Sequence, residues 1–212
     1  MNSSWPWAVL ALLGAYHGLN PAMGWLFALA LGLQERRRLA VFGALVPIAL
    51  GHAVAITIAI LVLRFAQQFL PIHTLRLAVA LILFALGFYR LFRTSHPKGS
   101  GMRVGGKDLF LWSFLMASAH GAGLMIVPAL LSQPMSTMDH GMGEAIVLSP
   151  MVIALAVLVH TASMLLVAGI LAIVFFETYE QVGLRILKHT WVNFELLWAI
   201  ALLISGSLVL MS

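Results

Sequence analysis

The sequence contains no cysteine among its 212 residues. This absence excludes disulfide bonds, thiolate metal sites and dithiol redox chemistry, and it leaves the redox compartment undetermined. Charge is also scarce, because Asp, Glu, Lys and Arg make up 9% of the chain, whereas a soluble domain carries about 25%. Hydrophobic residues make up 62%. The composition therefore predicts an integral membrane protein whose main surroundings are the lipid bilayer.

Two classes of function find no support in the sequence. The signatures of a nucleophile elbow, a P-loop and a His-Glu-x-x-His zinc protease are absent, so we expect no enzyme activity. A formal net charge of +5 would be compatible with a nucleic-acid partner. The basic residues, however, stand in short loops between apolar runs, which is the pattern of membrane topology. We therefore expect no nucleic-acid partner.

Six apolar runs are long enough to cross a hydrocarbon core, which needs roughly 20 helical residues. No basic region precedes the first run and no clear cleavage site follows it, so we expect it to stay as a helix. The first and fifth runs exceed one span, and tilting or kinking would absorb the excess. The sequence thus predicts an all-α polytopic membrane protein with six transmembrane helices. They cover Trp5–Leu33, Leu39–Phe65, Leu75–Phe92, Leu109–Leu131, Ile146–Phe176 and Val192–Leu210.

Positive charge is concentrated in the first, third and fifth loops between these runs. The fourth loop has no Lys or Arg, whereas the second has Arg64 and Arg76 and fits the pattern less well. Because loops rich in Lys and Arg stay in the cytoplasm, we expect a multi-pass protein of the inner (plasma) membrane with both termini outside, in the periplasm. The basic residues of the odd loops are Arg36, Arg37, Arg38, Arg90, Arg93, Lys98, Arg103, Lys107, Arg185 and Lys188.

The two halves of the sequence resemble each other in where their histidines stand. Three spans in each half give the second half the opposite orientation, and inverted repeats are typical of transporters, with a site where the halves meet. We predict a first three-helix repeat over residues 1–93, a basic cytoplasmic linker over 94–108 and a second repeat over 109–212. The matching pairs are His17-Gly18 with His120-Gly121, His52 with His160, and His73-Thr74 with His189-Thr190.

Four histidines lie well inside apolar spans, at positions 17, 52, 120 and 160. An imidazole there costs free energy unless it is paired, hydrogen-bonded or in a wet cavity. A single buried histidine usually bonds to a backbone carbonyl of a neighbouring helix. Four of them at repeat-related positions favour a common functional role for His17, His52, His120 and His160. His73 and His189 stand at membrane edges and are expected to be interfacial.

The stretch "AYHGLNPAMGW", residues 15–25, places a proline inside the first span. Pro21 removes a helix hydrogen bond and clashes with the preceding turn, and Asn20 can replace a lost bond. One interpretation is a kinked, tightly packed helix. The other is a broken helix whose irregular backbone builds a site, with His17 and Asn20 on one face and Met23 beside them if the break turns the second half. We expect helices 1 and 4 to be broken or kinked.

The stretches "GAYHGLNPAMGW", "QERRR", "IALGHAVAITIAIL" and "LRLAVALILFALGFYRLFR" resemble the nickel–cobalt transporter (exporter) family of the lysine-exporter and disulfide-reductase membrane superfamily. His17, Pro21, Gly51, His52 and Gly87 match that family's motifs. The resemblance covers roughly residues 10–93, with a weaker echo over 109–210. It implies membrane transport of a transition-metal cation.

The sequence departs from that family directly after Pro21. The family has Asp-His there, and this chain has Ala22-Met23. Imidazole with oxygen ligands suits nickel and cobalt, whereas a thioether favours a softer ion such as copper(I). The resemblance therefore implies transport more firmly than it implies nickel, and loss of the metal site is an open alternative.

The fourth loop contains a cluster of methionine and histidine, Met135, Met138, His140 and Met142, on the side that we expect to face outward. Thioethers bind copper(I) selectively, so one interpretation is metal capture outside the membrane. The other is a flexible connector in a chain that holds 11 methionines. Glu195 is the one acidic residue within a predicted span, near Asn193. We expect these two residues to serve gating or proton coupling, or a hydrogen-bonded structural role.

Three functions remain open from the sequence. The first is a carrier of a nickel, cobalt or copper cation through a site of His17, Asn20, Met23, His52, His120 and His160. The second is a membrane redox protein whose histidines ligate haem, and the third is an exporter of an amino acid or another small solute on the same scaffold. Candidate partners are a periplasmic metal-binding protein and further copies of the chain.

Overall fold

The computed structural model describes residues 5–92, 105–131, 149–182 and 194–211. All regular structure in these ranges is helical. Its elements are α1 (Trp5–Leu19), η1 (Pro21–Met23), α2 (Trp25–Glu35), α3 (Arg38–Ala66), α4 (Ile72–Phe92), α5 (Gly106–Ala119), α6 (Ala122–Met125), α7 (Val127–Leu131), α8 (Pro150–Val182) and α9 (Phe194–Met211). The predicted all-α class is confirmed.

Two of these helices, α3 and α8, are long and apolar enough to cross a membrane, and α5 with α6–α7 would be a third if the bent pair counts as one span. The remaining apolar helices are shorter. This part of the chain therefore has the helices of a membrane protein. α8 begins at Pro150, four residues after the predicted start of the fifth run at Ile146, which lies outside the described residues.

The first predicted break lies between α1 and α2, where the proline forces it. Asn20 adopts an extended backbone, and its side-chain Oδ1 accepts a hydrogen bond from the Ala22 N–H at 2.9 Å, which caps the short helix η1. Gly24 follows with φ of +112°, a conformation that a side chain would strain. The chain then restarts as α2 at Trp25.

The second break lies between α5 and α6, inside the fourth predicted span. His120 ends α5, and Gly121 has φ of +68°. The axes before and after this break differ by 51°. Because no proline stands at this turn, the left-handed glycine carries the change of direction. Breaks in helices 1 and 4 were both predicted, and both occur.

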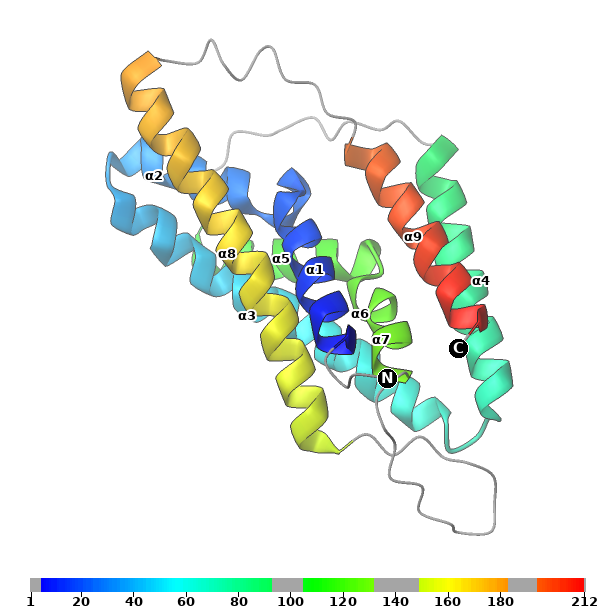
Figure 1. Ribbon diagram of the computed structural model, residues 1–212. Helices are drawn as coiled ribbons and strands as arrows, with labels where there is room; N and C mark the ends of the chain where they lie inside the picture. Colours follow the sequence, from blue (N-terminus) through cyan, green and yellow to red (C-terminus); the bar gives the residue numbers. More distant parts are fainter. Residues whose placement is uncertain (1–4, 93–104, 132–148, 183–193, 212) are drawn as a thin grey trace.

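The helices pack in three pairs: α1 lies along α8, α5 lies along α3, and α4 lies along α9 (Figure 1). Glycine makes the closest of these contacts. A Cβ added at Gly14 would overlap the backbone carbonyl of His160 on α8, and one at Gly51 would overlap the carbonyl of Phe110 on α5. These glycines let backbones meet, which is how helices associate in lipid.

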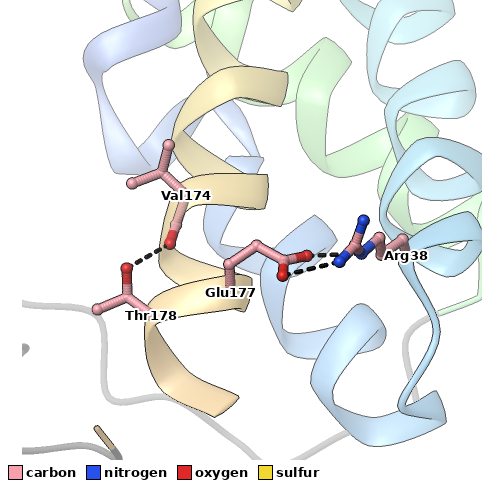
Figure 2. Close-up of polar contacts among 4 residues, drawn as sticks. All are labelled: Arg38, Val174, Glu177 and Thr178. Atoms are coloured by element: carbon pink, nitrogen blue, oxygen red, sulfur yellow. Dashed lines mark hydrogen bonds and ion pairs between the residues drawn. The ribbon is translucent and has the colours of Figure 1, made fainter. Parts of the chain in front are cut away.

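An ion pair joins the beginning of α3 to the last turns of α8. Nη2 of Arg38 donates to Oε2 of Glu177 at 2.9 Å, and Nε of Arg38 lies 2.6 Å from Oε1 as an ion pair (Figure 2). In the same turn, the hydroxyl of Thr178 donates to the Val174 carbonyl. The bidentate geometry fixes how these two long helices meet at this end.

Candidate functional site

Three imidazole rings meet in the interior, one from each of three helices. His17 of α1, His52 of α3 and His160 of α8 are fully buried. Their ring centroids are 4.8 Å apart for His17 and His160, 5.5 Å for His52 and His160, and 5.6 Å for His17 and His52. The rings come from both halves of the sequence. We call His17, His52 and His160 the histidine cluster.

Backbone carbonyls of α1 orient two of these rings. Nδ1 of His17 donates to the Leu13 carbonyl at 2.7 Å, and Nδ1 of His160 donates to the Leu10 carbonyl at 3.2 Å. Because a carbonyl oxygen only accepts, Nδ1 holds the hydrogen in the neutral ring and Nε2 holds the lone pair. Metal-binding histidines show this arrangement, in which a second-shell acceptor fixes the tautomer and leaves Nε2 for the ion.

His52 differs from its two neighbours. Neither of its ring nitrogens has a hydrogen-bond partner in the described part of the chain. Nε2 of His160 and the hydroxyl of Thr161, the next residue on α8, also lack one there. An unsatisfied buried polar group costs about 1–3 kcal/mol. The cluster therefore holds polar atoms that a bound ligand would satisfy.

The spacing of the three rings suits a single metal ion. With metal–nitrogen bonds of about 2.0–2.1 Å, imidazoles on one tetrahedral ion have ring centroids about 5 Å apart. Among the described residues, however, no three His, Asp or Glu side chains are already arranged to hold an ion. Binding would thus require the rings to turn, and His52, which no hydrogen bond holds, is the ring best able to do so.

The same spacing does not suit haem. Two axial imidazoles bind on opposite faces of a porphyrin, each with a ring nitrogen directed at the iron, whereas the rings of His52 and His160 are stacked with their centroids 5.5 Å apart. The ring of His17 is at similar distances from both rings, so it lies close to the plane that passes midway between them. The porphyrin plane would pass through that position.

His120 stands at the second break and is almost fully buried. Its Nδ1 donates to the Met116 carbonyl at 2.8 Å, four residues earlier. His17 makes the same bond four residues back to Leu13 at the first break. His120 is also close enough to interact electrostatically with His17. The predicted pair His17 and His120 thus shares a ring hydrogen bond to the carbonyl four residues earlier.

Asn20 and Met23 are the other predicted site residues at the first break. Both are buried, but neither lies between the three rings of the histidine cluster. Asn20 is buried and caps η1 as described. Met23 is fully buried in an apolar cluster with residues of α4 and α9. A role for either in binding an ion stays a prediction.

Several predicted residues lie outside the described part of the chain. These are the outer-loop residues Met135, Met138, His140 and Met142, together with Asn193, His189 and most of the 94–108 linker. The backbone of Glu195 lies in the first turn of α9, and its side chain is not described. His73 is exposed at the beginning of α4.

Sequence reasoning missed the groups that support the first break from the second half. The indole of Trp112 on α5 donates to the Ala22 carbonyl at 3.2 Å, and the hydroxyl of Ser113 donates to the Ile48 carbonyl at 2.7 Å. Trp25 likewise donates to the Leu19 carbonyl at 3.2 Å. A tryptophan inside a predicted span was the available signal, since an indole N–H in lipid requires an acceptor.

The comparisons with known proteins do not extend this picture. The sequence matches no family model, and it finds no significant match among curated proteins or solved structures.

Proposed function

We propose that this protein is a six-helix membrane carrier that moves a transition-metal cation through the histidine cluster. The single observation that carries the proposal is the meeting of three fully buried imidazoles from α1, α3 and α8. Ionisable side chains that are buried within membrane-spanning helices usually have a functional role, because burying them costs free energy. Two of the rings are held by Nδ1 in the orientation that ligating histidines use.

The helix arrangement supports two inverted three-helix repeats. If the two repeats are exchanged, each helix takes the place of its counterpart in the other repeat. The packed pair α1 and α8 then becomes the packed pair α5 and α3, and α4 and α9 still form a pair. Each break has a histidine before it and a left-handed glycine, with Gly24 seven residues after His17 and Gly121 directly after His120. A pseudo-two-fold axis of this kind places the transport site between the halves, where the cluster lies.

The path of the chain supports six spans. In Figure 1 α1, α4 and α8 rise, and α3, α6–α7 and α9 descend, while α2 and α5 run mainly across the view. Arg36–Arg38 stand at the turn from α2 to α3, Arg90 near the end of α4 and Lys107 in the first turn of α5, whereas Arg64 and Arg76 flank the turn from α3 to α4, which lies at the lower end of the view. By the positive-inside rule the upper end faces the cytoplasm and both chain ends face outward, as in a plasma-membrane protein.

The test is cation transport by purified protein in proteoliposomes. We expect uptake of nickel(II), cobalt(II) or copper(I) by the wild type and its loss in His17→Ala and in His52→Ala. His73→Ala, an exposed histidine on α4, is the matched control and keeps wild-type uptake. Uptake of each ion that is unchanged in both cluster variants would refute the proposal.

A further inference from the structure

One methionine stands close to each of the two helix breaks, six residues after His17 and five residues after His120. Met23 belongs to η1 of the first break, and Met125 ends α6, just after the second break. Both are fully buried in one cluster. We call it the methionine cluster, and its members are Met23, Val79, Ala80, Leu83, Met125, Leu202 and Val209.

The methionine cluster adjoins the break histidines. Leu13 and Tyr16 of α1 pack against it, and the ring of Tyr16 lies edge-on to His17 with centroids 6.4 Å apart. A Cβ added at Gly121, next to His120, would contact Leu202 and Leu83 of the cluster and Leu86, which packs against it. Residues of the methionine cluster thus pack against residues that adjoin both break histidines.

The charge of the surroundings limits the cargo. The described carboxylates Glu35, Asp108 and Glu177 all lie near helix ends, and Glu177 is already paired with Arg38. Among the side chains that the structure describes, the donors of the interior are neutral imidazoles and thioethers, which offset none of a cation's charge. The cost of taking an ion out of water grows with the square of its charge, so a divalent ion costs about four times as much as a monovalent ion of equal size.

Resting on the proposed function, we infer that Met23 and Met125 form a thioether subsite beside the histidines and that the cargo is a soft monovalent cation of the copper(I) class. Thioether and imidazole donors together select such ions over nickel(II) or zinc(II). The pairing of one methionine per break, and not the abundance of methionine, carries the inference. The subsite would receive the ion as it leaves or enters the histidine cluster.

The test is titration of the purified full-length protein with silver(I), a redox-stable stand-in for copper(I), and with nickel(II). Met→Leu conserves volume and shape well enough to keep a core folded. We expect the double variant Met23→Leu/Met125→Leu to bind silver(I) at least tenfold more weakly, while its nickel(II) affinity stays within twofold of the wild type. Met151→Leu, which removes an exposed thioether, and Met164→Leu, which removes a buried one from another cluster, should leave silver(I) binding unchanged.

Unchanged silver(I) affinity in the double variant would overturn the inference, and so would an equal loss in Met164→Leu. These outcomes are distinct from a failure of the proposed function. If His17→Ala and His52→Ala abolish transport but the methionine variants bind silver(I) normally, only the thioether subsite is wrong. If the histidine variants transport every ion normally, the carrier proposal itself is wrong.

Discussion

The imidazole of His160 on α8 donates to the backbone carbonyl of Leu10 on α1 at 3.2 Å. The bond joins two helices whose sequences are 150 residues apart. It forms where Gly14, one turn after Leu10, lets the backbone of α8 approach α1 directly. The orientation of a candidate ligand thus depends on the absence of a side chain on another helix.

We therefore predict that Gly14→Ala weakens cation binding without touching a ligand. The new Cβ would overlap the His160 carbonyl, which is backbone and cannot move aside alone. Overpacking of this kind costs about 1–3 kcal/mol. Thermal unfolding in detergent and titration with the transported ion should show a lower melting temperature and an affinity reduced at least tenfold.

Gly43→Ala is the control for that change, because a Cβ at Gly43 on α3 meets nothing within 4 Å. Alanine stabilises a helix interior by about 0.5–1 kcal/mol relative to glycine. Gly43→Ala should keep its affinity and melt no lower than the wild type. Equal effects of the two substitutions would show that the contact with His160 is not the cause.

His52→Leu should separate stability from function. Both ring nitrogens of His52 lack a hydrogen bond in the described structure, so an apolar replacement removes a desolvation cost of about 1–3 kcal/mol. We expect the metal-free variant to unfold at the same or a higher temperature than the wild type, yet to lose cation binding. A variant that is clearly less stable without metal would mean that His52 makes an interaction that supports the fold.

Asn20→Ser tests whether Asn20 acts as a cap or as a ligand. Serine caps a helix about as well as asparagine, whereas Asn20→Ala should cost about 0.5–2 kcal/mol, because the Ala22 N–H loses its partner. If the role is capping alone, Asn20→Ser keeps both the melting temperature and the affinity. A stable Asn20→Ser with a tenfold loss of affinity would instead show that the amide contacts the ion.

Charge exchange tests the ion pair between Arg38 and Glu177. Their side chains are 66% and 32% exposed, so solvent screens the attraction and we expect a coupling of about 0.2–1 kcal/mol. Arg38→Glu should lower the melting temperature, and the double variant Arg38→Glu/Glu177→Arg should restore most of the loss. The difference should shrink as salt rises from 0.05 to about 0.5 M. A double variant no better than the single one would show that the pair contributes nothing.

The run lengths predicted the helices well because an apolar stretch in lipid has no alternative to helix. Pro21 predicted the first break. The second break was predicted because His120-Gly121 repeats the pair His17-Gly18. Sequence spacing did not reveal that His160, more than His120, would share the interior with His17 and His52. That arrangement depends on which helices pair, and the pairing is set by close contacts such as that of Gly14 with α8.

The central claim is that the histidine cluster holds the transported cation. X-ray absorption of the purified protein, loaded in turn with nickel(II), cobalt(II) and copper(I), tests it most directly. For the ion that binds, the account predicts outer-shell scattering from at least two imidazoles, reduced in His17→Ala, in His52→Ala and in His160→Ala but retained in His73→Ala. A spectrum without imidazole scattering, or one that the three cluster variants leave unchanged, would contradict it.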